Sequence, residues 1–93
     1  MPSSELDSLR AAMDVLNRRL VDVLHERARL CRLIARCKQA SGRPAADPAR
    51  EQAMLASLLS VPAGGGFPPE SLAPILRAVF AESRELVERS TGR

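Results

Sequence analysis

Aromatic residues are almost absent from this sequence: its 93 residues include two phenylalanines and neither tryptophan nor tyrosine. Because β-strands favour aromatic and β-branched residues, this scarcity weighs against a β-sandwich. No apolar run reaches the ~18 residues of a membrane-spanning helix, and the first residues lack the charged and apolar segments of a secretion signal. We therefore expect a soluble, cytoplasmic protein that has no membrane partner.

Residues typical of metal, redox and nucleophilic sites are also scarce. Cys31 and Cys37 are six positions apart, which suits neither a Cys-x-x-Cys pair nor a disulfide, and His25 is the single histidine. The glycines at 64–66 are not followed by the Lys and Ser or Thr of a phosphate-binding loop, which favours a flexible hinge. We expect reduced, mostly buried thiols and no bound metal.

Leu, Ala, Arg and Glu dominate the composition, which is typical of helices. The chain carries 14 basic and 11 acidic residues, with a formal net charge of +3. Its basic residues are spread among the acids, whereas a nucleic-acid-binding protein more often clusters them on one stretch. The length suits one domain. The sequence therefore predicts a single all-α domain over residues 1–93 that does not bind nucleic acid.

The spacing of apolar residues predicts three helices, at about 5–40, 48–60 and 71–90. Apolar residues recur every three or four positions from Leu6 to Cys37, and no proline or glycine interrupts them. Asp47-Pro48 is a capping acid followed by a proline at the first helical position. The last helix begins shortly before Pro74, because proline is tolerated only near a helix start.

The length of the first helix predicts an assembly. A helix of about 35 residues extends ~52 Å, whereas a compact chain of this size has a diameter of only ~32 Å. Its apolar stripe runs along the whole helix, so the part that overshoots must be covered. The commonest cover is a second copy of the chain about a two-fold axis. We therefore expect an intertwined helical homodimer.

Polar residues interrupt the apolar stripe of each predicted helix. Arg27 stands between Val23 and Leu30 in the first, Glu51 lies in the second, and Ser83 lies in the third. A buried guanidinium requires an anionic partner or a wet cavity. An internal salt bridge, or a snorkelling side chain at the edge of a bundle, is the structural alternative. Three such interruptions together indicate a polar cavity inside a helical bundle, where helical proteins place ligand sites.

Four further residues extend this candidate site. Lys38 projects on nearly the same side as Arg27, ~16 Å along the helix axis. Asp47 and Arg50 lie at the start of the second helix, where a simple helix cap and a solvated first-turn residue are the alternatives. Arg10 is ~25 Å from Arg27, too far for both to hold one small molecule within one chain, but an antiparallel partner helix would bring its Arg10 to this Arg27. Several cations with an acid and a hydroxyl predict a site for a small polycarboxylate that bears a hydroxyl.

Short motifs run through essentially the whole chain: Leu9-Arg10, Glu26-Arg27, Ala35-Arg36-Cys37-Lys38, Arg43-Pro44, Asp47-x-x-Arg50-Glu51 and Glu82-Ser83-Arg84. This combination resembles the all-helical class of chorismate mutases. The resemblance implies an intertwined homodimer with two equivalent sites, each completed by the first helix of the partner. It also implies the [3,3]-sigmatropic rearrangement of chorismate to prephenate, without cofactor, metal or covalent intermediate.

The resemblance also implies a role for each site residue. The carboxylates of the substrate would be bound by Arg27 and Arg10 of the partner subunit, with contacts from Arg50 and Ser83 nearby. Lys38 would donate to the ether oxygen, whose negative charge grows in the transition state. Glu51, with Asp47, would hold the ring hydroxyl.

Val87 departs from the family pattern. The family commonly places a Gln, or a protonatable Glu, four residues after the serine as a second donor to the ether oxygen. Glu88 does not replace it, because it points ~100° further round the helix. Loss of such a donor can lower the rate by ~10²–10³. A slower mutase, a mutase improved by a partner protein and a relative acting on a modified chorismate are all compatible with this position.

Two kinds of alternative function stay open. On the same fold, the chain would rearrange 4-amino-4-deoxychorismate or eliminate pyruvate from isochorismate. In another class, it would be a non-catalytic helical dimerisation or regulatory module that contacts nucleic acid or a partner enzyme. That module predicts that Arg27 and Lys38 are solvated or paired with acids of the same chain. Docking on another enzyme of the shikimate pathway is compatible with the mutase.

Overall fold

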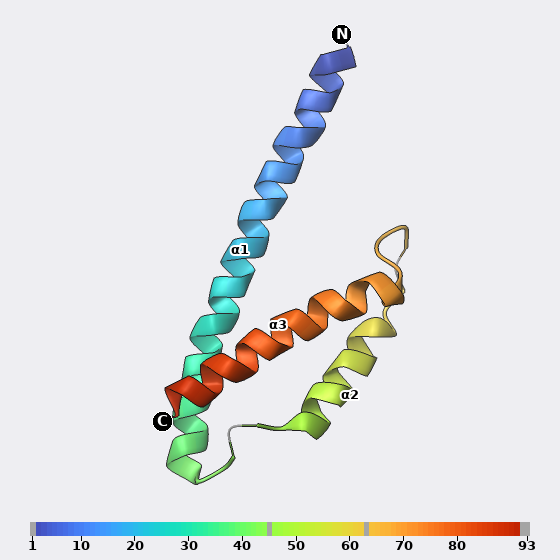
Figure 1. The fold of residues 1–93 in the computed structure, drawn as a ribbon. Coiled ribbons are helices and arrows are strands. Elements are labelled where there is room, and N and C mark those ends of the chain that lie inside the picture. The colour runs from blue at the N-terminus through green and yellow to red at the C-terminus, as the bar shows by residue number, and fades with distance from the viewer. Residues whose placement is uncertain (1, 45, 63, 92–93) are drawn as a thin grey trace. The chain divides into compact units, whose positions relative to one another are not determined.

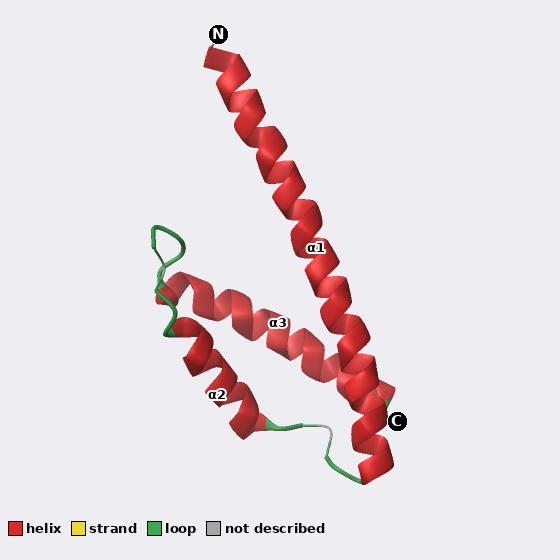
Figure 2. Cartoon of the chain, turned by 180° about the vertical axis from the view of Figure 1, so that it is seen from behind, coloured by secondary structure: helices red, strands yellow, loops and turns green. Residues whose placement is uncertain are grey.

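The regular structure of this chain is entirely helical. A computed structural model describes residues 2–44, 46–62 and 64–91, with side chains from residue 4 onward within these ranges. Its elements are α1 (Pro2–Ser41), α2 (Pro48–Leu59) and α3 (Pro69–Ser90) (Figures 1 and 2). The described residues contain no strand, which confirms the all-α prediction. None of the described helices combines the length and the apolar character needed to cross a membrane.

α3 begins at Pro69, two residues before the predicted start. Proline suits the first helical position because its φ is fixed and because an N–H there would have no partner within the helix. The backbone oxygen of Pro68 accepts hydrogen bonds from the N–H groups of Ser71 and Leu72, both at 3.0 Å. Pro74 therefore lies inside the helix, further from the start than expected, and removes only one backbone hydrogen bond.

The end of α1 is fixed by Gly42. This glycine has a φ of 73°, a left-handed conformation that other residues adopt only with strain. The N–H of Arg43 donates to the backbone oxygen of Lys38 at 2.9 Å, and the N–H of Gly42 donates to that of Gln39 at 3.4 Å. These two bonds form a Schellman motif, which satisfies the last carbonyl groups of the helix. The turn that carries Lys38 is thus held in a defined conformation.

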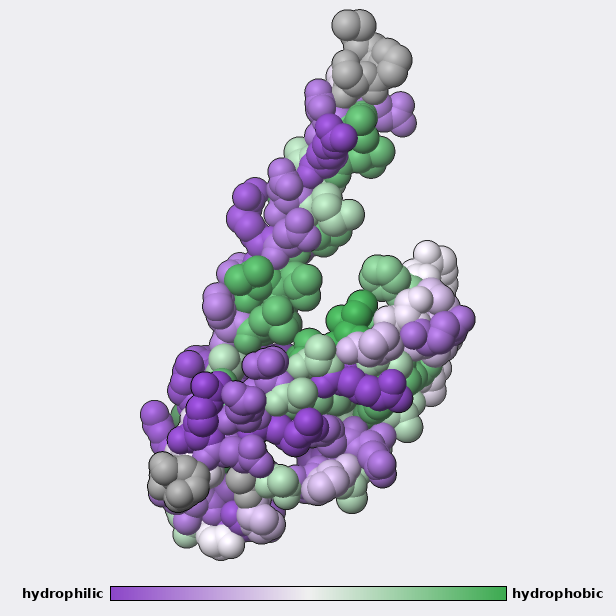
Figure 3. Space-filling view, viewed as in Figure 1, coloured by the Kyte–Doolittle hydropathy of each residue, from purple (hydrophilic) through white to green (hydrophobic). Residues whose placement is uncertain are grey.

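The chain divides into two units within α1, residues 1–30 and residues 31–93. In the first unit, the apolar stripe predicted from the sequence is uncovered, and Leu9 is 62% exposed. Figure 3 shows hydrophobic side chains along this part of α1. The other exposed members of the stripe in this unit are Leu6, Met13, Leu16, Leu20, Val23 and Leu30. The predicted homodimer would cover this stripe, and it stays a prediction.

In the second unit, the last turns of α1 pack against the end of α3. Cys31, Ala35 and Val87 form a buried cluster, with Leu86 packed against it. α2 and α3 contact each other, and both views of the ribbon place them alongside (Figures 1 and 2). Cys31 is buried as expected, but Cys37 is exposed. The two thiols lie on different faces because six residues turn a helix by ~600°, well short of two full turns.

Candidate functional site

The eight predicted site residues are divided between the two units. Arg10 and Arg27 belong to residues 1–30. The other six belong to residues 31–93: Lys38, Asp47, Arg50, Glu51, Ser83 and Val87. Arg10 is exposed, whereas Arg27 and Lys38 are each half-buried, and the Nε atom of Arg27 is buried. Neither of these two cations is therefore fully solvated.

The start of α2 is organised by Asp47. The Oδ1 atom of Asp47 accepts a hydrogen bond from the backbone N–H of Arg50 at 3.2 Å, and Pro48 occupies the first helical position. The helix-cap interpretation of Asp47 is therefore confirmed. Asp47 and Arg50 are exposed, while Glu51 is half-buried. The cap thus fixes the turn in which Arg50 and Glu51 stand.

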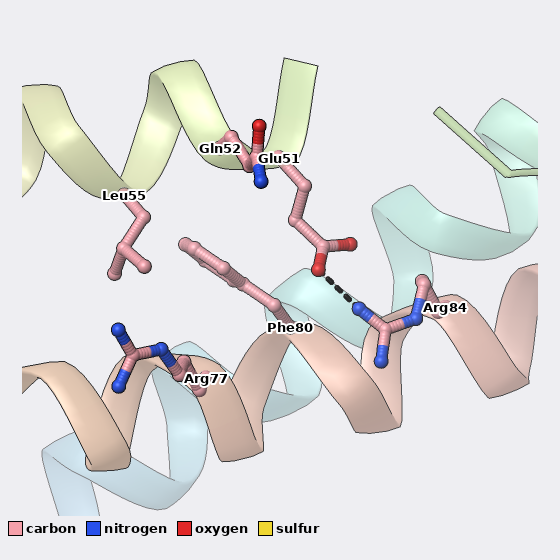
Figure 4. Close-up of a pocket in the computed structure, with 6 residues that line it drawn as sticks. All are labelled: Glu51, Gln52, Leu55, Arg77, Phe80 and Arg84. Carbon is pink, nitrogen blue, oxygen red and sulfur yellow. Dashed lines mark hydrogen bonds and ion pairs between the residues drawn. The ribbon is translucent and has the colours of Figure 1, made fainter. Parts of the chain in front are cut away.

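Glu51 of α2 forms an ion pair with Arg84 of α3 (Figure 4). The side chain of Glu51 is 26% exposed and that of Arg84 is 44% exposed. This contact joins residues 33 positions apart, from two different helices. By contrast, Arg29 pairs with Glu26 within a single turn of α1, where the hydrogen bond that the guanidinium donates to the carboxylate raises the pKa of the exposed arginine. The Glu51–Arg84 pair is thus a tertiary contact at the candidate site.

A pocket of about 300 Å³ lies between α2 and α3. Its lining is Glu51, Gln52, Leu55, Arg77, Phe80 and Arg84 (Figure 4). The ring of Phe80 lies in the middle, with Leu55 and Arg77 toward one end and the Glu51–Arg84 pair toward the other. An apolar centre between charged groups suits a small anion that carries a ring. Among the described residues, no three His, Cys, Asp or Glu side chains come together as a metal site.

Five residues of this pocket are absent from the predicted site. Arg77, Phe80 and Arg84 are three and four positions apart, so they share one face of α3. Leu55 follows Glu51 by four positions on α2 and shares its face in the same way. This helical spacing is the signal that could have found them. Arg84 follows Ser83 directly in the Glu82-Ser83-Arg84 motif, but it does not interrupt the apolar stripe of its helix and so was not predicted as a site residue.

Ser83 and Val87 are four positions apart and share a face of α3, next to the face that lines the pocket. The hydroxyl of Ser83 is half-buried and donates to the backbone oxygen of Val79 at 2.8 Å. Val87 is buried against Cys31 and Ala35. Its side chain has no hydrogen-bond donor, so position 87 can offer apolar contacts but no side-chain hydrogen bond.

A sequence profile described as "Chorismate mutase type II" matches residues 9–88. The chain belongs to this family. The matched segment contains all eight predicted site residues, and the resemblance inferred from the motifs is confirmed.

One curated relative of this chorismate mutase family chain is a much longer protein. It is 35% identical over 80 residues to the T-protein of Enterobacter agglomerans, covering 86% of this chain and 21% of that protein. The chain thus spans about a fifth of the length of this curated relative.

Two solved structures of chorismate mutase from Thermus thermophilus match nearly end to end. Form II is 36% identical with a TM-score of 0.84, covering 91% of this chain and 96% of that chain. Form I is 35% identical with a TM-score of 0.80, covering 85% and 98%. The chain thus shares its fold with these two structures over most of its length.

Proposed function

We propose that this chorismate mutase family member rearranges chorismate to prephenate. The observation that carries the proposal is the family match over residues 9–88, because it spans every candidate site residue. In the reaction the ether C–O bond to the ring breaks while a C–C bond forms between the enolpyruvyl group and the ring. No atom is gained or lost, so the protein must fold the substrate and stabilise charge.

The candidate residues supply those two functions. Arg27, with Arg10 of the partner subunit, binds the substrate carboxylates and holds the reacting ends together. Lys38 donates to the ether oxygen as negative charge develops on it, and the Schellman motif at Gly42 keeps the turn of Lys38 in place. Glu51 accepts a hydrogen bond from the ring hydroxyl. Asp47 supports it by capping α2.

Three further residues shape the surroundings of the substrate. Arg50 and Ser83 add contacts near the carboxylates, and Val87 gives an apolar wall where relatives place a donor.

The reaction would take place in the cytoplasm, as part of aromatic amino-acid biosynthesis. The chain would act alone or docked on another enzyme of the shikimate pathway.

The experiment follows loss of chorismate by absorbance, with product identification by chromatography. We expect prephenate, and we expect Lys38→Ala to lower kcat/KM by at least ~100-fold, because a positioned transition-state donor is lost. Arg36→Ala is the matched control, because Arg36 is an exposed cation on the same helix. Parallel assays with 4-amino-4-deoxychorismate and isochorismate test the alternatives. A Lys38→Ala variant with unchanged kcat/KM, or a product other than prephenate, would overturn the proposed mechanism.

A homodimer accounts for the uncovered stripe on α1. Its side chains, including Leu9, Leu16 and Leu20, are exposed in the single chain, and a two-fold partner would bury them. An antiparallel α1 would also bring Arg10 of the partner subunit toward Arg27.

Subunit mixing tests this arrangement. Arg10→Ala and Arg27→Ala homodimers should each be nearly inactive, because every site lacks one carboxylate ligand. After the two variants are refolded together, half of the dimers are mixed, and one of their two sites contains both arginines. Activity should therefore return to about a quarter of the wild-type value. A mixture that stays inactive, while sedimentation shows dimers, would contradict a site shared between subunits.

A further inference from the structure

The carboxylate of Glu51 is already engaged by a cation of the same chain. Oε1 of Glu51 accepts a hydrogen bond from Nη1 of Arg84, and both side chains line the pocket between α2 and α3 (Figure 4). A carboxylate has two oxygens and about four acceptor positions. Glu51 can therefore accept a further hydrogen bond from a ligand, but its charge is largely balanced before the ligand arrives.

We propose that Arg84 positions Glu51 and makes the site prefer a ring hydroxyl to a protonated ring amine; this inference rests on the proposed function. A hydroxyl is a neutral donor, so it can use the second oxygen of Glu51 without meeting an unfavourable charge. A ring amine is protonated near neutral pH and would bring a second cation close to the guanidinium of Arg84. Two positive charges beside the same carboxylate repel each other, and this repulsion disfavours binding of the amine.

The rest of the pocket strengthens this preference. Arg77 is a second arginine in the lining, and with Arg84 it outnumbers the one carboxylate, Glu51. Phe80 is buried and Leu55 is half-buried, so apolar groups separate the charged ends of the pocket, while Glu51 and Arg84 stay partly exposed, which keeps the expected effect modest. A carboxylate without its arginine would have the opposite preference, because an ammonium group pairs with it directly.

The test compares kcat/KM for chorismate with kcat/KM for 4-amino-4-deoxychorismate. We expect the wild type to prefer chorismate, and Arg84→Gln to reduce this preference about fivefold, mainly through a lower KM for the amino substrate. Arg84→Lys should retain most of the preference, because the positive charge stays. In a Glu51→Gln background, Arg84→Gln should have little further effect, because the carboxylate that it positions is gone.

Arg89→Gln is the matched control. Arg89 is on the same helix and pairs with Glu85 at 3.7 Å, with both side chains largely exposed outside the pocket. Its removal should leave the substrate preference unchanged. If the wild type is active and Arg84→Gln keeps the wild-type preference, the inference about Arg84 is wrong while the proposed function stands. A folded wild type that is inactive on both substrates would overturn the proposed function and the inference together.

Discussion

The substitution Val87→Gln tests the role of position 87 in folding stability separately from its role in activity. Val87 is 7% exposed and packs against Cys31 and the fully buried Ala35. Glutamine places an amide in this apolar cluster, and a buried polar group without a partner costs about 1–3 kcal/mol. Its greater volume adds strain. We therefore expect the free energy of unfolding to fall by about 2 kcal/mol, roughly a thirtyfold change in the folded-to-unfolded ratio.

Urea unfolding at one fixed protein concentration measures this loss, since association would make the apparent stability depend on concentration. Val61→Gln is the matched control, because Val61 is 65% exposed and the same substitution there should change stability by less than about 0.5 kcal/mol. Equal stability of the two variants would refute the burial argument for position 87.

The activity of Val87→Gln should move differently from its stability. Glutamine restores the kind of donor that relatives place four residues after the serine, so kcat at a temperature where the variant is folded should equal or exceed that of the wild type. A fall in kcat of about tenfold or more in a folded variant would mean that valine itself is required at this position.

Two other substitutions test local structure. Asp47→Ala should lower the free energy of unfolding by about 1 kcal/mol through loss of the cap, whereas Asp47→Asn should change it by only a few tenths; equal effects in urea unfolding would argue against the cap. Phe80→Ala should cost about 3 kcal/mol because this ring is buried between α2 and α3, while Phe67→Ala should cost little because Phe67 is exposed. Similar melting temperatures for the two phenylalanine variants would contradict this assignment.

Local chemistry explains why the helices could be predicted from the sequence. Gly42 and Pro48 act within their own turns, so the end of α1 and the start of α2 follow from a few neighbouring residues. For the start of α3, the rule that proline is tolerated only near a helix start favoured residue 71, close to Pro74, whereas Pro69 also suits the first helical position. The hydrogen bonds to the oxygen of Pro68 decide between them, and these exist only once the chain is folded.

The candidate site was predicted only in part, because some of its contacts join distant segments. Glu51 stood out as an acid within an apolar stripe, but nothing near it in the sequence points to its partner Arg84, 33 residues later. Asp47 had two compatible interpretations, a helix cap and support for binding of the ring hydroxyl. The observed hydrogen bond establishes the cap and does not test the role in binding. Periodicity thus reports which face a residue occupies, while pairing between helices depends on their packing.

The uncovered stripe on α1 links the order of this helix to the amount of protein present. A helix of this kind owes its stability mostly to what packs against it, and Leu6, Met13 and Leu20 remain exposed in the lone chain. If the proposed homodimer covers this part of α1, dilution would remove the cover, and any site that borrows an arginine from a second subunit would be lost with it. The activity per chain would then rise with the protein concentration, so the level of expression would itself regulate that activity.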